Sequence, residues 1–302
     1  MARSTGNRPA EIFGYPIGNR SAEAQDIREK HWCPFVDRPC DKKSRLIDFP
    51  FGVCSAEHSG EIYTICPRRF EEQGTIEGVS RVLDFGDFSN TIVFPEISLP
   101  NVGSIDYVLV RHKPMKPEVE DFVSVEFQSD STTSTGRLVQ GIVDFFQGRD
   151  VQEQTYKFGM NTYDSIKRAI TQLMNKGIVY ETWDTKCYWV VQEYIYANLV
   201  NRYGFKTDGF SSEHASRFAL YDLVRKDNRL VLIPTRFIST TVDEVYQAIR
   251  SNPGLLNKPS NQKEYKHEHR TSKHRSHRTH DGSPTGAGAA GQGAGCDTGH
   301  AG

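Results

Sequence analysis

The chain has 302 residues, of which 37% are hydrophobic and 25% are charged, and its formal net charge is −1. These totals suit a globular protein that buries a sizeable core in one large domain or two smaller ones. They exclude a chain-wide basic field for nucleic acid, although local charge clusters can still bind phosphate.

The first 30 residues are polar and then helix-like, in the stretch SAEAQDIREK. They lack the apolar core of a signal peptide, and the chain has no apolar run of about 18 residues that would span a membrane. We therefore expect a cytoplasmic protein without a membrane partner, in which residues 1–30 form an N-terminal segment.

Four of the six cysteines follow at once, with the spacing C-x6-C-x13-C-x11-C over Cys33, Cys40, Cys54 and Cys66. A chain without an export signal favours thiols or metal ligands over disulfides. A tetrahedral thiolate site is the natural use of such a cluster, and iron or zinc would satisfy it. The intervals are looser than those of a zinc ribbon, so four unrelated thiols are the alternative. Residues 31–75 are the expected four-cysteine metal-binding domain.

Strand-rich sequence extends from Arg81 to Gln128, in runs such as TIVF, IDYVLV and FVSVEFQ. Residues two apart on a strand point the same way, so Glu126 and Gln128 should share one face. A turn with two prolines can fold the strand that begins at Asp106 back beside them. Glu96, ten residues before Asp106, could bring a third acid to the same point.

Two carboxylates this close repel one another unless a cation lies between them, and an oxygen-rich site of this kind suits Mg²⁺. A magnesium ion there would neutralise a scissile phosphate and activate water for phosphodiester hydrolysis. From spacing alone, the alternative in which Asp106 and Glu126 are solvated strand ends is the stronger one.

The rest of the chain alternates helical and extended patterns. A Ser/Thr loop precedes residues 161–177, which have apolar residues at helical spacing and Gly177 as a plausible C-cap. Residues 186–200 begin as a strand pattern, but their later part fits a helix about as well as a strand, so the boundary stays open. Residues 229–240 predict a strand and 241–250 a short amphipathic helix. Residues 257–302 are basic and His-rich and then Gly/Ala-rich, so we expect a disordered tail.

The strings EISL, IDYVLV and VEFQ resemble the active-site core of the PD-(D/E)XK nucleases. Gln128 stands where most of these enzymes have lysine, and Ser129 follows it, which is similar to the NotI restriction endonuclease family. The stretch KRAITQ, residues 167–172, also resembles a helix of that family. The resemblance implies an α/β (α+β) core with a mixed central sheet flanked by helices, placed at residues 76–256. It implies Asp106, Glu126, Gln128 and Glu96 as catalytic residues, with Mg²⁺ on Asp106 and Glu126.

The cysteines extend the resemblance, because Cys-Pro-Phe, a later Cys, Gly-Val-Cys and Cys-Pro follow in the same order as in that family. This implies a structural iron on the four sulfurs, with zinc as a substitute. The implied activity is that of a type II restriction endonuclease, a homodimer that cuts double-stranded DNA at a specific site. A cognate DNA methyltransferase is the partner that such an enzyme requires in its host.

Phosphate contacts and base reading require Lys and Arg. Our preferred contacts with DNA are four basic residues, namely Arg68, Arg69, Lys167 and Arg168. Two alternatives stay open at this point. One is a non-catalytic DNA-binding or regulatory protein built on the four-cysteine module, and the other is a PD-(D/E)XK nuclease that acts in repair.

Overall fold

The computed structural model describes residues 6–72, 74–80, 88–206 and 208–252. The chain divides into two units, residues 1–256 and 257–302. The tail that the sequence predicts to be disordered lies outside the described residues, so everything below concerns the first unit. Within the described ranges, no helix is long and apolar enough to cross a membrane.

A four-stranded sheet, in the order β2-β1-β5-β6, organises the N-terminal part of the chain. Its strands are β1 (Arg8–Ile12), β2 (Tyr15–Pro16), β5 (Val53–His58) and β6 (Glu61–Thr64). Around it lie α1 (Ala22–Glu29), the short hairpin β3 (Trp32–Cys33) and β4 (Arg38–Pro39), and α3 (Thr135–Phe146). Because β1 pairs with β5, the first 30 residues and the cysteine segment share one sheet.

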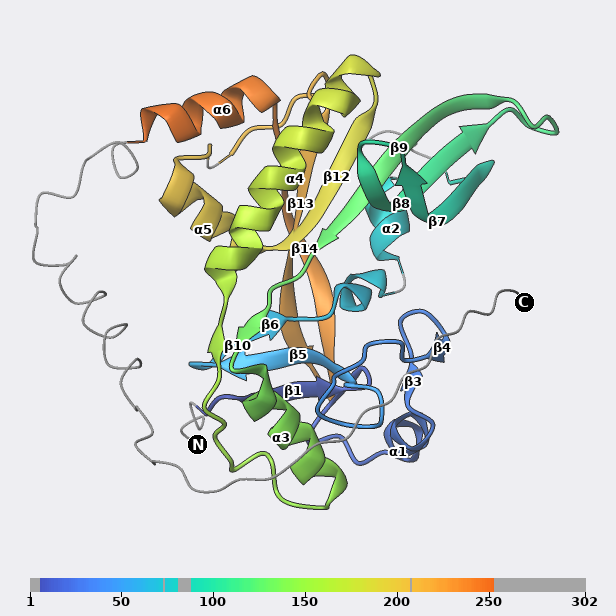
Figure 1. The fold of residues 1–302 in the computed structure, drawn as a ribbon. Coiled ribbons are helices and arrows are strands. Elements are labelled where there is room, and N and C mark those ends of the chain that lie inside the picture. The colour runs from blue at the N-terminus through green and yellow to red at the C-terminus, as the bar shows by residue number, and fades with distance from the viewer. Residues whose placement is uncertain (1–5, 73, 81–87, 207, 253–302) are drawn as a thin grey trace, which may run out of the picture. The chain divides into compact units, whose positions relative to one another are not determined.

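The central sheet has six strands in the order β14-β13-β12-β9-β8-β7. These are β7 (Thr91–Leu99), β8 (Gly103–His112), β9 (Val119–Gln128), β12 (Lys186–Gln192), β13 (Ser216–Lys226) and β14 (Arg229–Thr240). Strand β12 runs parallel to both β9 and β13, and the other pairs are antiparallel. The predicted mixed sheet with flanking helices is confirmed (Figure 1).

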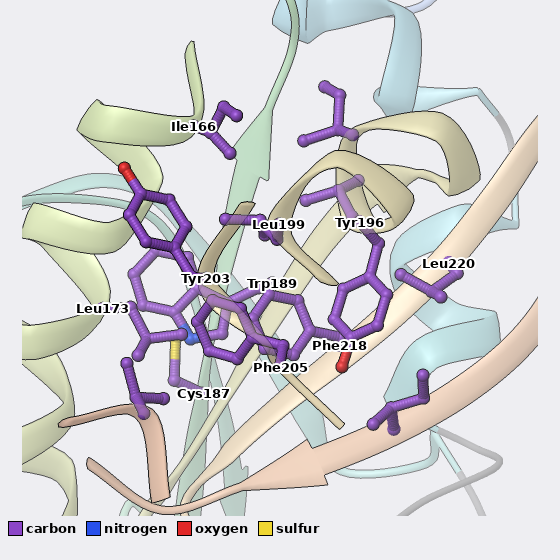
Figure 2. Close-up of a cluster of buried hydrophobic side chains, with 14 of the residues drawn as sticks. Ile166, Leu173, Cys187, Trp189, Tyr196, Leu199, Tyr203, Phe205, Phe218 and Leu220 are labelled. Carbon is purple, nitrogen blue, oxygen red and sulfur yellow. The ribbon is translucent and has the colours of Figure 1, made fainter. Parts of the chain in front are cut away.

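Helices α4 (Thr162–Thr182) and α5 (Glu193–Tyr203) cover one face of this sheet. Figure 2 shows the core between them, where Trp189 of β12 lies among Leu173, Leu199 and Phe218. The open question at residues 186–200 resolves into strand β12 followed by helix α5. The last helix, α6 (Val242–Ser251), begins with a capping box at Thr241 and Glu244.

Gly177 is not the helix C-cap that the sequence suggests, because α4 continues to Thr182 and is capped at Trp183. A Cβ atom at Gly177 would come within 2.7 Å of Val242 Cγ2. The glycine therefore allows the middle of α4 to pack closely against the start of α6.

The opposite face of the sheet packs against the short 3₁₀ helix η1 (Pro67–Glu71) and α2 (Thr75–Ser80). Val123, Val125 and Phe127 of β9 point to this side, whereas Glu126 and Gln128 point towards α4. The later part of β9 is thus covered on both faces, and the alternation of its sequence places Glu126 and Gln128 together on one of them.

Asp130, two residues beyond Gln128, fastens the end of β9 to the helices. Its buried carboxylate accepts hydrogen bonds from Thr162 Oγ1 at 2.6 Å, Ser165 Oγ at 2.7 Å and the Tyr194 hydroxyl. Thr132–Thr133 (β10) and Gly159–Met160 (β11) form a two-stranded ladder beside it. The hydrogen bonds of Asp130 attach the start of α4 to the end of β9, the strand that carries Glu126 and Gln128.

Candidate active site

Asp106 and Glu126 lie opposite each other on neighbouring strands. The paired register of β8 and β9 ends at Tyr107 and Val125, and the next step along both strands brings these two acids face to face. The ladder does not continue between them. Instead, Asp106 Oδ2 accepts the backbone N–H of Phe127 at 2.8 Å. At this step of the hairpin a carboxylate therefore takes the place of a backbone carbonyl as the acceptor across the two strands.

Both carboxylates are held in low-dielectric surroundings. Burial raises the pKa of Glu126 to about 7, and the charge of Asp106 raises it as well, against the lowering effect of Lys176. Burial also raises the pKa of Asp106, against the Phe127 N–H, Lys176 and Arg68, which favour its charged form. A pair of acids that repel each other in a buried place is a site that a cation would stabilise.

Lys176 lies beside the acid pair, and sequence reasoning missed it. It lies on α4, its side chain is almost wholly buried, and its ammonium donates to Glu126 Oε1 at 2.5 Å and to the Ser104 carbonyl at 2.6 Å. Fifty positions separate it from Glu126, so no strand motif could include it. The only signal in the sequence was a lysine on the apolar side of a helix, in register with Leu173 and Tyr180.

Gln128 lies on the same side of β9 as Glu126, as predicted from their spacing. Its side chain is buried, and its amide Nε2 donates to the Ser129 carbonyl at 2.9 Å. The amide oxygen is left to accept, so the residue can orient a polar ligand but contributes no charge.

Glu96 lies on the edge strand β7 in the left-handed backbone region, with φ of 53°. Its side chain is two-thirds exposed and accepts from Arg68 Nη2 at 2.6 Å. Its charge is close enough to raise the pKa of Asp106. The structure therefore places the third predicted acid beside the pair, held by an arginine.

A cavity of about 350 Å³ lies between the cysteine segment and two of the predicted acids, Glu96 and Asp106. Its walls include Glu96 and Asp106 from the central sheet, and Lys42, Cys66 and Arg68 from the N-terminal part. A larger cavity, of about 620 Å³, lies around Tyr63, Gln192 and Arg225, away from the paired acids. The smaller cavity is the one of the two that is lined by a member of the acid pair, Asp106, whereas Glu126 and Gln128 do not line it.

The four cysteine thiols of the N-terminal part interact electrostatically with one another. Cys33 is close enough to Cys66 and Cys40 for their charges to interact, and Cys54 interacts with Cys66 and Cys33 in the same way. Burial raises the pKa of Cys33 to about 11 and that of Cys54 well above its usual value. Within the described residues, however, no three His, Cys, Asp or Glu side chains already have metal-binding geometry.

Backbone N–H groups point at these sulfurs. Phe35 and Val36 donate to the sulfur of Cys33, Gly14 to that of Cys54, and Arg68 to that of Cys66. Donors of this kind stabilise thiolates, which are the form that binds soft metal ions. The donor set thus fits iron or zinc chemically.

Arg69 is placed where it cannot meet DNA, contrary to our expectation. Its side chain is fully buried and bonds to Glu11 at 2.9 Å, to Glu72 at 2.9 Å and to the Leu230 carbonyl at 2.7 Å. It joins the N-terminal sheet to β14. Arg68, its neighbour, points the other way, into the cavity with the acids.

Arg69→Met should therefore destabilise the protein, because Glu11 would be left as an unpaired buried charge. We expect a loss of roughly 3–5 kcal/mol in the free energy of unfolding, measured by urea denaturation. Arg68→Met is the matched control and should cost much less, because Arg68 is partly exposed. Equal losses for the two variants would contradict this assignment.

Lys167 and Arg168 lie on the exposed side of α4, as a DNA contact requires. Lys167 pairs with Asp164 at 3.0 Å, and Arg168 bonds to Ser165 at 3.4 Å. Both remain accessible to a phosphate.

Comparison with known families gives one match, to a family described as Restriction endonuclease NotI, over residues 11–206. The matched region contains the four clustered cysteines, the paired acids, Gln128 and Lys176. No curated protein matches the chain.

Proposed function

The chain belongs to the NotI restriction endonuclease family, a family of type II deoxyribonucleases that cleave double-stranded DNA at specific sites, and from this premise we propose that Asp106 and Glu126 form its catalytic centre. Restriction endonucleases of this kind depend on a divalent metal. We propose magnesium as that metal, with Gln128 and Glu96 completing the site.

The observation that carries this proposal is the half-buried carboxylate of Asp106 opposite the buried carboxylate of Glu126 on neighbouring strands, close enough that the charge of Asp106 raises the pKa of Glu126. Magnesium is bound by one or two carboxylates together with substrate phosphate oxygens and water, so two acids are a sufficient protein contribution. When bound, the ion supplies charge neutralisation at the phosphate and activation of water.

The chain's own residues then have separate tasks. The Phe127 N–H fixes one oxygen of Asp106, and Lys176 fixes one oxygen of Glu126, so each carboxylate keeps its other oxygen for a ligand. Gln128 can orient water or phosphate by hydrogen bonds. Arg68 is proposed to contact a DNA phosphate, because its guanidinium lies in the cavity beside the acids. Lys167 and Arg168 are proposed as further phosphate contacts.

For Cys33, Cys40, Cys54 and Cys66 we propose a structural iron site, with zinc as a substitute. The support is the thiolate donor set, the mutual closeness of the sulfurs and the N–H groups aimed at them. Four protein ligands would leave no open coordination position, so the site has a folding and positioning role. We keep a domain boundary near residue 75 as part of the same proposal.

A homodimer and a cognate methyltransferase complete the proposed system. A two-fold dimer suits a palindromic target, because each subunit can then cut one strand of the duplex. The methyltransferase protects the host from the same activity.

Digestion of several long genomic DNAs tests this function directly. The purified protein should give sharp fragments that require Mg²⁺ and that are the same from one preparation to the next. Retardation of DNA without any cleavage would indicate a regulatory DNA-binding protein, and ragged or end-dependent products would indicate a repair nuclease.

Gln128→Ala should slow cleavage by about tenfold to a hundredfold, because an orienting hydrogen bond is lost but the acids and their charge balance remain. Single-turnover rates on a short duplex that contains the mapped site would measure this. A loss as large as that from removing Asp106 would show that the amide does more than orient a ligand.

A further inference from the structure

We propose that Lys176 is the positive residue of the catalytic centre and that it replaces, from helix α4, the charge that Gln128 cannot carry. This inference rests on the proposed function and adds a residue that lies outside the strand motif. Lys176 acts through Glu126, so it is a positioning residue.

The contacts of the ammonium support this role. A lysine has three N–H donors, and Glu126 Oε1 and the Ser104 carbonyl take two of them among the described residues. Ser104 stands two residues before Asp106. Lys176 therefore holds Glu126 directly and the strand that carries Asp106 through the Ser104 carbonyl.

The fold holds Lys176 firmly in place. Helix α4 is fastened near its start by the hydrogen bond from Ser165 to Asp130, which lies on the chain just after Gln128. It is fixed again beside Lys176, where Gly177 lets the helix approach Val242. A long side chain that is already buried and held by its helix loses little further entropy when a substrate binds.

The charge balance also explains why residue 128 is an amide. Asp106 and Glu126 bring two carboxylates to neighbouring positions, and Lys176 already pairs with one of them. A second ammonium at position 128 would lie on the same strand face and leave little net negative charge to attract a divalent cation. The two acids are compatible with one neighbouring lysine. Strand β9 could carry it at position 128, or helix α4 can carry it at position 176.

A charge swap tests the proposal. Lys176→Met should lower the cleavage rate by about a hundredfold to a thousandfold, the usual loss for one polar group in a preorganised site. Gln128→Lys alone should raise the Mg²⁺ concentration needed for half-maximal cleavage by about tenfold or more. The double variant, with Gln128→Lys and Lys176→Met together, should cleave at least about tenfold faster than Lys176→Met alone.

The readouts separate this role from a merely structural one. Cleavage rates at saturating DNA, Mg²⁺ dependence, DNA binding in Ca²⁺ and thermal unfolding should be measured for every variant. Lys206→Met is the matched control, because Lys206 also pairs with a glutamate, Glu244 at 2.9 Å, outside the site. It should leave the cleavage rate unchanged.

Several outcomes would overturn the inference. One is wild-type cleavage by Lys176→Met, and another is a double variant no faster than Lys176→Met although both are folded. If Lys176→Met does not fold, Gln128→Lys decides alone, and unchanged Mg²⁺ dependence would refute the charge argument. A wild-type protein without metal-dependent cleavage would refute the proposed function itself, which is a separate failure.

Discussion

Asp106→Asn is expected to abolish Mg²⁺-dependent cleavage of duplex DNA, with a loss of at least about a thousandfold. The asparagine oxygen can still accept the Phe127 N–H, so this contact between β8 and β9 should persist. The negative charge and the second oxygen, the one available to a metal, are lost. Metal binding contributes several kcal/mol to a transition state of this kind, and about 4 kcal/mol corresponds to a factor of about a thousand in rate.

The measurement is cleavage of a long DNA that contains many sites, with binding in Ca²⁺ and circular dichroism as controls for the fold. Asp106→Asn is a cleaner variant than Glu126→Ala, which should also abolish cleavage. The alanine would leave the buried ammonium of Lys176 with only the Ser104 carbonyl as a partner among the described residues. A complete set of discrete fragments from Asp106→Asn would refute the assignment of this pair.

Cys54→Ser is expected to have the second large effect, on folding and metal content together. Cys54 is buried within the N-terminal sheet, and the charges of Cys66 and Cys33 act on its pKa. A serine there would remove one of four proposed ligands and leave a hydroxyl in apolar surroundings. We expect substoichiometric iron or zinc by elemental analysis and a lower midpoint of thermal unfolding.

Cys187→Ser is the matched control, because Cys187 is equally buried but lies in the core of the central sheet. It should lower stability by about 1–3 kcal/mol, the cost of burying a polar group without a good partner, and leave the metal content unchanged. If Cys54→Ser retained full metal and behaved like Cys187→Ser, the four cysteines would be unrelated thiols.

Local patterns in the sequence predicted the strands of the active site well. Alternation placed Glu126 and Gln128 on one face of β9, and the proline turn allowed β8 to return beside it. The pairing of Asp106 with Glu126 could be inferred because both strands belong to one hairpin. Strand β13, residues 216–226, was not identified, although its run of apolar residues is typical of a strand buried on both faces.

Longer-range relations were beyond the sequence. Lys176 reaches Glu126 only because α4 crosses the sheet at that point, and the register of a helix on a sheet depends on the whole core. The two adjacent arginines illustrate the same limit. Arg68 and Arg69 have identical chemistry, but a 3₁₀ turn sends one to the cavity and the other to a buried carboxylate.

The position of Arg68 has a practical consequence for work with chelating agents. Its backbone N–H points at the sulfur of Cys66, while its side chain lies in the cavity with Glu96. If the cysteines hold the proposed metal, its removal would therefore disturb the wall of the cavity that Glu96 and Asp106 line. Loss of cleavage in EDTA would then report on both proposed metal sites at once. Recovery after dialysis into Mg²⁺ alone, compared with recovery in Mg²⁺ plus ferrous iron or zinc, would tell them apart.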